Sequence, residues 1–338
     1  ELLNENVLDV IEIIKRAYSE AVAYYTCKYL QVTSIFATLE CFLSIQAIGP
    51  YFKSEKIQSY IDSDAANENK KYLITKIFKE GLFYADPNNF NYENAKVECI
   101  KLRLVLYAKK EATSQDNEIN LFEFVPDLLT HLHKELNKET NNPTNASGQE
   151  IDHTNEQMVL AATMKRFSDN YRSKITDQFF YLSKTVHECP ECQRIIKYSS
   201  DIFCLCNMRP DRAADYLGKT NLNIIDLFKH YRKKRLFVNE NTYCKYCRKN
   251  QKDVNRTKIF YTSPFNLIIE IQTEKENKCK LTIDESINIQ EFVEIKTCTV
   301  KYSLVGAVFT EKKENEPIKY VSFSKKQNGK WIYFDGNN

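Results

Sequence analysis

The sequence predicts an α+β fold, because helical patterns dominate its first part and strand patterns its second. Residues 1–52 carry two amphipathic helical segments, and residues 121–136 carry a third. Between residues 178 and 335 the pattern changes to apolar runs and alternating stretches of strand length. We find no internal repeat. The order of the patterns indicates that the helices come first along the chain and the strands afterwards.

Each helical segment has an apolar stripe that predicts core packing. The stripes comprise Val7, Val10, Ile11, Ile14 and Ala17 in the first segment, Ile35, Leu39, Phe42 and Leu43 in the second, and Phe124, Leu128, Leu129 and Leu132 in the third. Pro126 is compatible with the third helix only near its start. Residues 137–157 are polar and almost free of large apolar side chains, which indicates a solvated loop.

The strand patterns lie toward the end of the chain. Residues 265–271, "FNLIIEI", form a buried apolar run, whereas "KYSLVGAVF" at 301–309 and "KYVSFS" at 319–324 alternate. "GKWIYFD" at 329–335 closes the series. These segments predict the sheet part of the fold.

The composition favours a packed protein without a membrane or nucleic-acid role. Of the 338 residues, 43% are hydrophobic and 12% are aromatic, enough to fill a large core. The formal net charge of +3 comes from 48 basic and 45 acidic side chains, whereas a dedicated nucleic-acid binder would be more basic. No apolar run approaches the length of a transmembrane helix, and the N-terminus does not resemble a signal peptide. We expect an intracellular protein, cytoplasmic or nuclear, with no membrane and no nucleic acid among its partners.

Two C-x2-C pairs predict a metal site. Cys189 and Cys192 form the first pair, and Cys244 and Cys247 form the second. Each pair can present two thiolates from one tight turn, and two pairs complete a tetrahedral Zn2+ site with no open position. Eleven cysteines, an odd number scattered along a long chain, also fit reduced thiols better than a disulfide framework. Four free structural thiols are the alternative, and a structural Zn2+ is the favoured interpretation.

Residues 193–243 separate the two pairs, a longer insert than a minimal zinc ribbon needs. We expect strands within this insert, from "SSDIFCLCNM" at 199–208 and from "NLNIIDLF" at 221–228. Cys204 and Cys206 are expected to pack in the core rather than to bind the metal.

Several segments resemble, in the same order, those of ubiquitin-specific proteases. "LFKHYRKKRLFVNENTYCKYCRKNQKDVNRTKIFYTSPFNLIIEI" is similar to the family's second cysteine pair and the aliphatic strand after it. "LFEFVPDLLTHLHKEL" resembles the helix after the family's Gln-Gln-Asp-Ala motif, and "ITDQFFYLSKTVHECPEC" resembles the approach to its first pair. "KYSLVGAVF" and "KYVSFSKKQNGKWIYFD" resemble the strands that carry its histidine and aspartate.

The resemblance, which runs from about residue 25 to residue 335, implies the papain-like fold of these proteases. That fold has a helical thumb, a β palm and zinc-ribbon fingers that hold ubiquitin. We expect one such domain over residues 1–338, in which 1–24 form an N-terminal helix, 25–180 mostly the thumb, 181–262 mostly the fingers and 263–338 the palm.

The resemblance places no cysteine at the family's nucleophile position. The family uses a cysteine nucleophile, a histidine base and an orienting Asp or Asn. Aligning residues 39–42 with its Leu-Gln-x-Leu motif puts Thr33 in the cysteine slot, and a shift of one residue would put Ser34 there. Lys28 stands where the family has the asparagine that donates to the oxyanion. Cys41 becomes a core residue of the helix.

The base is also replaced. The family's Gly-His-Tyr reads Ile318-Lys319-Tyr320 here, and no histidine follows His230, although Asp335 keeps the orienting position. A substitute Thr33–Lys319 pair is disfavoured, because an internal threonine hydroxyl is a weak acid and the lysine would need a strongly lowered pKa. Helix capping by Thr33, and an exposed or ion-paired Lys319, are the favoured alternatives.

Changes also fall on positions that contact ubiquitin in the family. The resemblance places Asn120, Glu123 and Tyr320 among the binding residues, with Asn120 in place of an aspartate that grips the basic ubiquitin tail. Lys234 and Arg235 replace an acidic residue and its neighbour within the basic run 232–235. Such a run is usually a solvated face, with nuclear targeting or an acidic partner as weaker alternatives.

Three functions remain open at this point. The leading hypothesis is a catalytically inactive domain that binds ubiquitin, a ubiquitinated protein or other protein partners, or serves as a scaffold. The second is an active deubiquitinase with an unidentified nucleophile, for which Cys27 and Cys41 are the nearest thiols. The third is a structural subunit of a larger complex that does not bind ubiquitin.

Overall fold

The computed structural model describes residues 32–66, 71–86, 88–109, 121–137, 151–273, 279–295, 300–311, 319–326 and 328–334. The predicted N-terminal helix over 1–24 lies outside these residues. The chain divides into two compact units, Glu1–Leu136 with Leu304–Asn338, and Asn137–Ser303.

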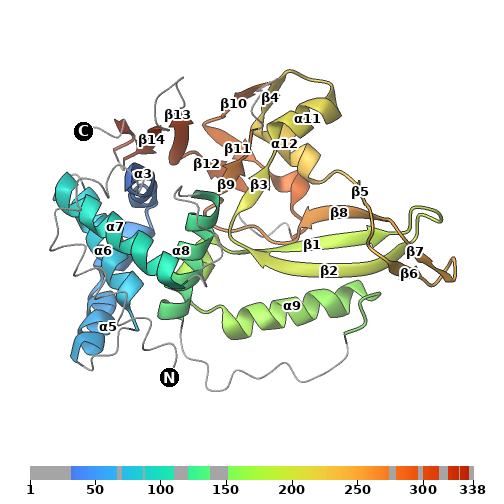
Figure 1. Cartoon of the computed structure of the whole chain (residues 1–338), viewed down its shortest axis with the longest axis horizontal. Helices are drawn as coiled ribbons and strands as arrows, with labels where there is room; N and C mark the ends of the chain where they lie inside the picture. The colour runs from blue at the N-terminus through green and yellow to red at the C-terminus, as the bar shows by residue number, and fades with distance from the viewer. Residues whose placement is uncertain are drawn as a thin grey trace. The chain divides into compact units, whose positions relative to one another are not determined.

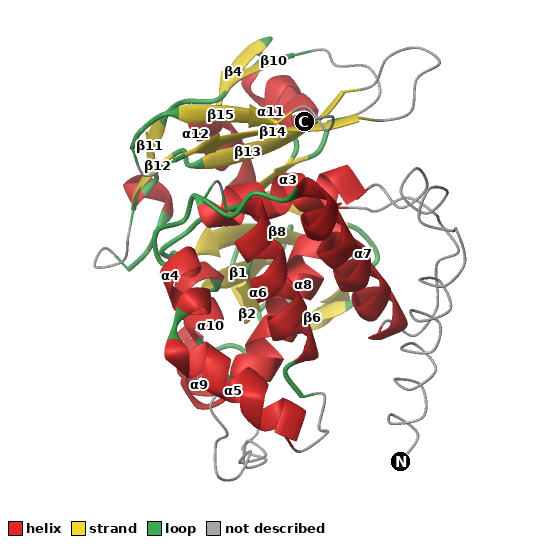
Figure 2. Cartoon of the chain, turned by 90° about the vertical axis from the view of Figure 1, so that its left-hand side faces the viewer, coloured by secondary structure: helices red, strands yellow, loops and turns green. Residues whose placement is uncertain are grey.

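The first unit combines helices from the start of the chain with strands from its end (Figures 1 and 2). Its described helices are α3 (Val32–Leu43), α4 (Ile48–Lys53), α5 (Glu55–Ala66), α6 (Leu73–Ala85), α7 (Tyr92–Lys109) and α8 (Leu121–Leu136). Its sheet has the order β13 (Gly306–Glu311), β14 (Lys319–Lys325) and β15 (Trp331–Phe334), all antiparallel.

Residues of the second and third predicted apolar stripes lie in the core of this unit, whereas the first stripe lies outside the described residues. Ile35 and Leu39 of α3 are fully buried, and Leu128 of α8 is as well. Phe42 packs against Phe78 of α6 with ring centroids 5.7 Å apart. Burying each such side chain contributes roughly 1.5–3 kcal/mol to the free energy of unfolding. The helices therefore depend on packing more than on intrinsic propensity.

One carboxylate satisfies the start of a helix in this unit, and one proline lies inside another helix. Glu135 of α8 accepts hydrogen bonds from the backbone N–H groups of Ile74 and Thr75 at 3.0 and 2.7 Å, and so satisfies the start of α6. Pro126 lies within α8, five residues after its first described residue, where it cannot donate to the carbonyl of residue 122. The helix nevertheless keeps the predicted bounds.

The second unit begins with α9 (Glu156–Asn170) and α10 (Lys174–Phe179) and contains a four-stranded sheet. The sheet has the order β2 (Ile195–Phe203), β1 (Tyr181–Glu188), β8 (Val254–Phe260) and β5 (Arg235–Phe237), with antiparallel neighbours. Helix α9 packs along β2 (Figure 1), and the buried Lys184 of β1 pairs with Glu156 at 2.5 Å.

Short elements complete the second unit around a core that includes Phe228 and Phe260. They are β3 (Cys206–Met208), α11 (Pro210–Leu217), β4 (Asn221–Asn223), α12 (Ile224–Tyr231), β6 (Thr242–Cys244), β7 (Lys249–Gln251), β9 (Ile269–Ile271), β10 (Lys280–Thr282), β11 (Ser286–Asn288), the 3-10 helix η1 (Gln290–Phe292) and β12 (Lys301–Ser303). β6 pairs only with β7 among the described strands.

One strand prediction is half wrong. Residues 199–208 do supply β2 and β3, but within 221–228 only Asn221–Asn223 is a strand, and α12 starts at Ile224. The side chain of Asn223 accepts from the N–H of Asp226, and Asp226 accepts from the N–H of Asn223. This capping box starts a helix whose apolar residues resemble those of a strand. The aliphatic run alone did not reveal it.

Candidate functional site

The four cysteines of the two C-x2-C pairs lie together in the second unit. All four sulfur atoms lie within 4.8 Å of one another. The Sγ atoms of Cys189 and Cys247 are 3.8 Å apart, and those of Cys192 and Cys244 are 3.7 Å apart. Cys204 and Cys206, in contrast, are buried elsewhere in the unit and are not part of this cluster. The cluster can hold a metal ion.

The backbone around each pair turns sharply to bring its sulfurs together. The first turn follows β1, and the second joins β6 to β7. Gln193 and Arg248, each directly after the second cysteine of its pair, have positive φ angles of 59° and 56°. A non-glycine residue in this region costs of order 1 kcal/mol, so the surroundings must impose it. The backbone N–H of Cys247 also points at the sulfur of Cys244, 3.5 Å away.

The sulfur spacing fits a tetrahedral metal centre. Four thiolates about 2.3 Å from a central Zn2+ stand about 3.8 Å from one another. The two measured separations, 3.8 and 3.7 Å, match that value. The four cysteines could therefore hold one metal ion.

The second candidate site is the start of α3 in the first unit, where the sequence places the nucleophile slot. Thr33 is partly buried and lies in the first turn of α3, so it is within the helix rather than before it. One turn further along, Phe36 packs against Phe334 of β15 with ring centroids 4.6 Å apart. Residue 334 directly precedes the orienting position, so this contact brings the start of α3 and the end of β15 together.

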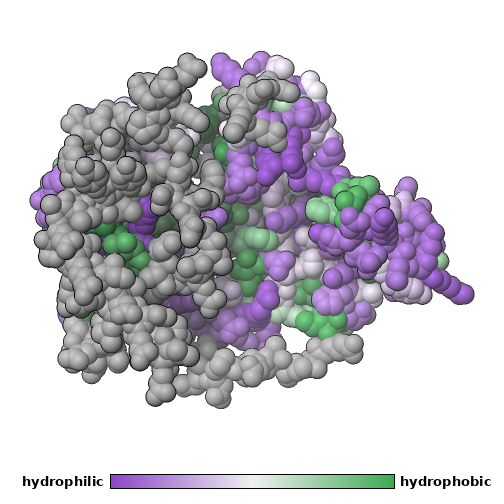
Figure 3. All heavy atoms as spheres, viewed as in Figure 1, coloured by the Kyte–Doolittle hydropathy of each residue, from purple (hydrophilic) through white to green (hydrophobic). Residues whose placement is uncertain are grey.

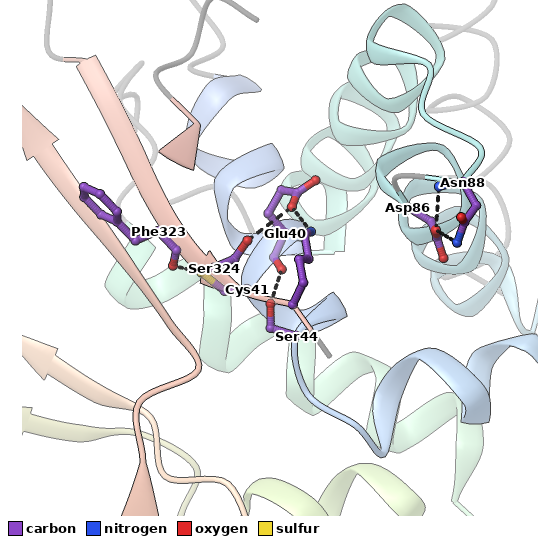
Figure 4. A network of polar contacts seen from close by, with 8 residues as sticks. Glu40, Cys41, Ser44, Asp86, Asn88, Phe323 and Ser324 are labelled. Atoms are coloured by element: carbon purple, nitrogen blue, oxygen red, sulfur yellow. Dashed lines mark hydrogen bonds and ion pairs between the residues drawn. The ribbon is translucent and has the colours of Figure 1, made fainter. Parts of the chain in front are cut away.

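Cys41 lies two turns inside the same helix and packs against the sheet of the first unit (Figure 4). Its Sγ lies 3.9 Å from the carbonyl oxygen of Phe323 in β14. Burial, and then the neighbouring Glu40 carboxylate, raise the pKa of the Cys41 thiol to about 12. At neutral pH roughly one thiol in 100,000 would be ionised, which is the opposite of an activated nucleophile.

Sequence reasoning missed a buried polar contact beside Cys41. Glu40 is 6% exposed, and its carboxylate pairs with Lys326 at 2.7 Å. Ser324 of β14 donates to the same carboxylate oxygen at 3.5 Å, and Ser44 donates to the Glu40 carbonyl at 3.3 Å (Figure 4). The ion pair joins α3 to the end of β14, two elements that are far apart in the sequence. No local sequence pattern predicts it.

The remaining predicted site residues are placed as follows. Glu123 is exposed on α8, and Tyr320 is 7% exposed in β14. Lys319 is the first residue of β14. Lys28, Asn120 and Asp335 lie outside the described residues. The structure thus brings the turn that holds Thr33 close to the end of β15, whereas the metal cluster belongs to the other unit.

No helix in the described part of the chain combines the length and apolar character needed to cross a membrane.

No curated protein matches the sequence. Solved structures that match include SAGA DUB modules that contain Ubp8. One is the SAGA Ubp8/Sgf11/Sus1/Sgf73 module bound to ubiquitin aldehyde, with a TM-score of 0.55 at 14% identity, covering 89% of this chain and 62% of that one.

A second match is a yeast SAGA module with a mutant Sgf73, with a TM-score of 0.57 at 15% identity, covering 91% of this chain and 62% of that one. A third is the Ubp8-Sgf11-Sgf73-Sus1 module, with a TM-score of 0.52 at 14% identity, covering 88% and 58%. The chain thus spans about three fifths of those solved chains. These matches confirm the predicted ubiquitin-specific-protease fold.

A sequence profile described as ubiquitin carboxyl-terminal hydrolase matches residues 35–338, nearly the whole chain. The sequence motifs, the fold and the family profile all indicate the same family. The chain therefore belongs to the ubiquitin carboxyl-terminal hydrolase family.

Proposed function

We propose that this chain is a catalytically inactive ubiquitin-specific-protease domain that binds ubiquitin or ubiquitinated proteins as a recognition or scaffolding module. The observation that carries the proposal is the first turn of α3. There the turn that packs beside the end of β15 holds Thr33, not a thiol.

The slot assignment has two supports, because the family profile starts only at residue 35. The first is the motif register over residues 31–52. The second is the contact of Phe36 with Phe334, which puts the turn of Thr33 beside the residue before Asp335. A cysteine protease needs its nucleophile and its orienting group near one imidazole, and this is where they would meet.

Two features support the loss of chemistry: the state of Cys41, the nearest thiol among the described residues, and the residue at the family's base position. Cys41 is packed against β14 with its pKa raised to about 12. The base position, at the start of β14, is Lys319, and all five histidines lie before residue 231. Without an imidazole, Asp335 has no base to orient, and replacing the oxyanion asparagine by Lys28 would alone cost about 100-fold or more in rate.

We propose that the four-cysteine cluster binds a Zn2+ ion. Cys189, Cys192, Cys244 and Cys247 would hold it with four thiolates, which leaves no coordination position for a water or a substrate. The ion would therefore have a structural role, holding the two turns at the ends of β1 and β6. This separates the metal from any catalytic step.

Binding of ubiquitin is the part of the proposal that the fold favours. The solved structures of the same fold include one bound to ubiquitin aldehyde and several assembled with Sgf11, Sus1 and Sgf73. An inactive member of such a fold retains a surface for ubiquitin or for protein partners while the chemistry is lost. Fold alone does not decide between the two, so a direct test is needed.

A cysteine introduced at Thr33 tests the slot and ubiquitin binding together. Thr33→Cys should be captured by ubiquitin that carries a C-terminal propargyl amide, whereas the unchanged protein should not. The first turn of a helix lowers the pKa of a thiol, so this residue would be partly ionised near pH 8 without a histidine. Intact mass spectrometry measures the covalent adduct, which adds the mass of one ubiquitin.

Two controls make the result specific. The unchanged protein contains Cys41, which should remain unlabelled because its thiol is protonated and packed against β14. Cys41→Ala in the Thr33→Cys background should leave the labelling unchanged. Labelling that Cys41→Ala abolishes would place the nucleophile at Cys41. No capture, together with no binding in a titration of labelled ubiquitin, would instead favour a structural subunit that does not bind ubiquitin.

A further inference from the structure

The second unit exposes three consecutive apolar side chains at the edge of its main sheet. Strand β5 is the last in the order β2-β1-β8-β5, and β8 is its only neighbour among the described strands. Leu236, Phe237 and Val238 are 55%, 37% and 64% exposed. Figure 3 shows an apolar patch where Figure 1 places β5, surrounded by hydrophilic surface. We call these three residues the β5 patch.

The cross-strand neighbours do not account for this exposure. Leu236 stands opposite Asn255 of β8, a polar residue, so it has no apolar partner in its row. Phe237 stands opposite the fully buried Val254 and lies under the guanidinium of Arg256, 4.4 Å from its ring centroid. Proteins usually protect an edge strand by keeping it short or charged, and β5 has three residues and follows a basic run, yet its apolar side chains remain exposed. An apolar edge with an unpaired backbone is typical of a strand that accepts another.

The charge around the β5 patch identifies the partner's chemistry. Residues 232–258 contain ten basic side chains and two acidic ones, Glu240 and Asp253, although the whole chain is almost balanced. The basic ones are Arg232, Lys233, Lys234, Arg235, Lys245, Arg248, Lys249, Lys252, Arg256 and Lys258. Arg232, Lys245 and Lys252 are exposed. A segment that covers the patch must therefore lie within a strongly positive field.

The two acidic residues are already committed within the unit. Glu240 pairs with Arg256, and the Asp253 carboxylate accepts from the N–H of Asn239 at 3.3 Å. Within the basic run, Lys234 pairs with Glu188 of β1. Lys249 pairs with Glu191 at 2.9 Å, so three of the ten cations have carboxylate partners within the unit, and six of the ten are exposed to solvent. A partner segment in which aliphatic side chains alternate with carboxylates would match both the charge and the apolar edge.

We infer that β5 is a docking edge for an extended acidic peptide segment of a partner protein, which adds as a further strand. Its backbone would pair with the free edge of β5, its aliphatic side chains would cover the β5 patch, and its carboxylates would face the surrounding lysines and arginines. The inference concerns β5 alone and does not require that the chain binds ubiquitin.

The test uses a fluorescein-labelled ten-residue peptide in which glutamate alternates with valine, followed by fluorescence polarisation with the full chain. Saturable binding is expected, with a several-fold weaker affinity when NaCl rises from about 50 to about 300 mM. The double variant Leu236→Ser/Val238→Ser changes only exposed side chains and should weaken binding about tenfold. Hydrogen exchange at the amides of residues 235–238 should slow when the peptide is present, as strand pairing requires.

Three comparison ligands decide the chemistry. A peptide with lysine in place of glutamate, and one with serine in place of valine, should each bind at least about tenfold more weakly. A single-stranded oligodeoxythymidine should not compete. Equal binding of the lysine peptide, no binding of the glutamate–valine peptide, or stronger binding of the oligonucleotide would overturn the inference. So would binding that leaves exchange at residues 235–238 unchanged.

Discussion

Cys244→Ser should abolish zinc binding and unfold the cysteine-bearing part of the second unit. Cys244 is fully buried, and its sulfur lies 3.7 Å from that of Cys192, so serine would leave three thiolates without their fourth partner. Structural Zn2+ sites contribute about 10–16 kcal/mol of apparent binding free energy, comparable to the stability of a whole domain. We therefore expect a fall in the melting temperature of more than about 10 °C. Metal analysis should find one zinc ion per chain before the change and none after it.

Cys279→Ser is the matched control for this experiment. Cys279 is a partly exposed thiol of the same unit and does not belong to the four-cysteine cluster. It should retain one zinc ion and nearly the original melting temperature. A chelator added to the unchanged protein should reproduce the effect of Cys244→Ser. Full thermal stability after complete removal of the metal would show that the four cysteines are ordinary buried thiols.

Gly306→Ala should destabilise the first unit by about 3 kcal/mol, the upper part of the usual range for overpacking. A Cβ atom at position 306 would lie 2.7 Å from the Sγ of Cys41 and 2.9 Å from its Cβ. The Cys41 Cα would be 3.3 Å away, so α3 itself would have to move away from β13. Chemical denaturation followed by circular dichroism measures the loss.

Gly49→Ala is the matched control for the glycine change. A Cβ at position 49, in α4, would meet nothing within 4 Å, so alanine should be neutral or stabilise the helix by up to about 1 kcal/mol. Adding Cys41→Ala to Gly306→Ala should restore part of the lost stability, because it removes the closest atom. Equal stability of Gly306→Ala and Gly49→Ala would contradict the packing of Cys41 against β13.

Much of the fold could be predicted from local patterns. The helix over 121–136 has a clear apolar stripe and occurs with the predicted bounds as α8. The alternating segments near the end of the chain became β12, β13, β14 and β15. The spacing of the two cysteine pairs was enough to predict their cluster, because a C-x2-C turn is a local structure.

Other features depend on contacts that no local pattern encodes. α12 was mistaken for a strand because its capping box outweighs its aliphatic composition. α9, which starts at Glu156 with Asn155 as its cap, lies partly in a stretch interpreted as loop. Glu40 and Lys326 pair across the chain, and their burial could be seen only once α3 was placed against β14. The β5 patch is likewise visible only from the strand order.

The start of α3 should carry no catalytic nucleophile, so the chain should not hydrolyse a fluorogenic ubiquitin amide. The purified chain should release the coumarin of ubiquitin-7-amido-4-methylcoumarin no faster than buffer does. Thr33→Ala and Cys41→Ala should give the same trace, because neither side chain acts in a reaction. Turnover by the unchanged protein that either Thr33→Ala or Cys41→Ala abolishes would contradict the account.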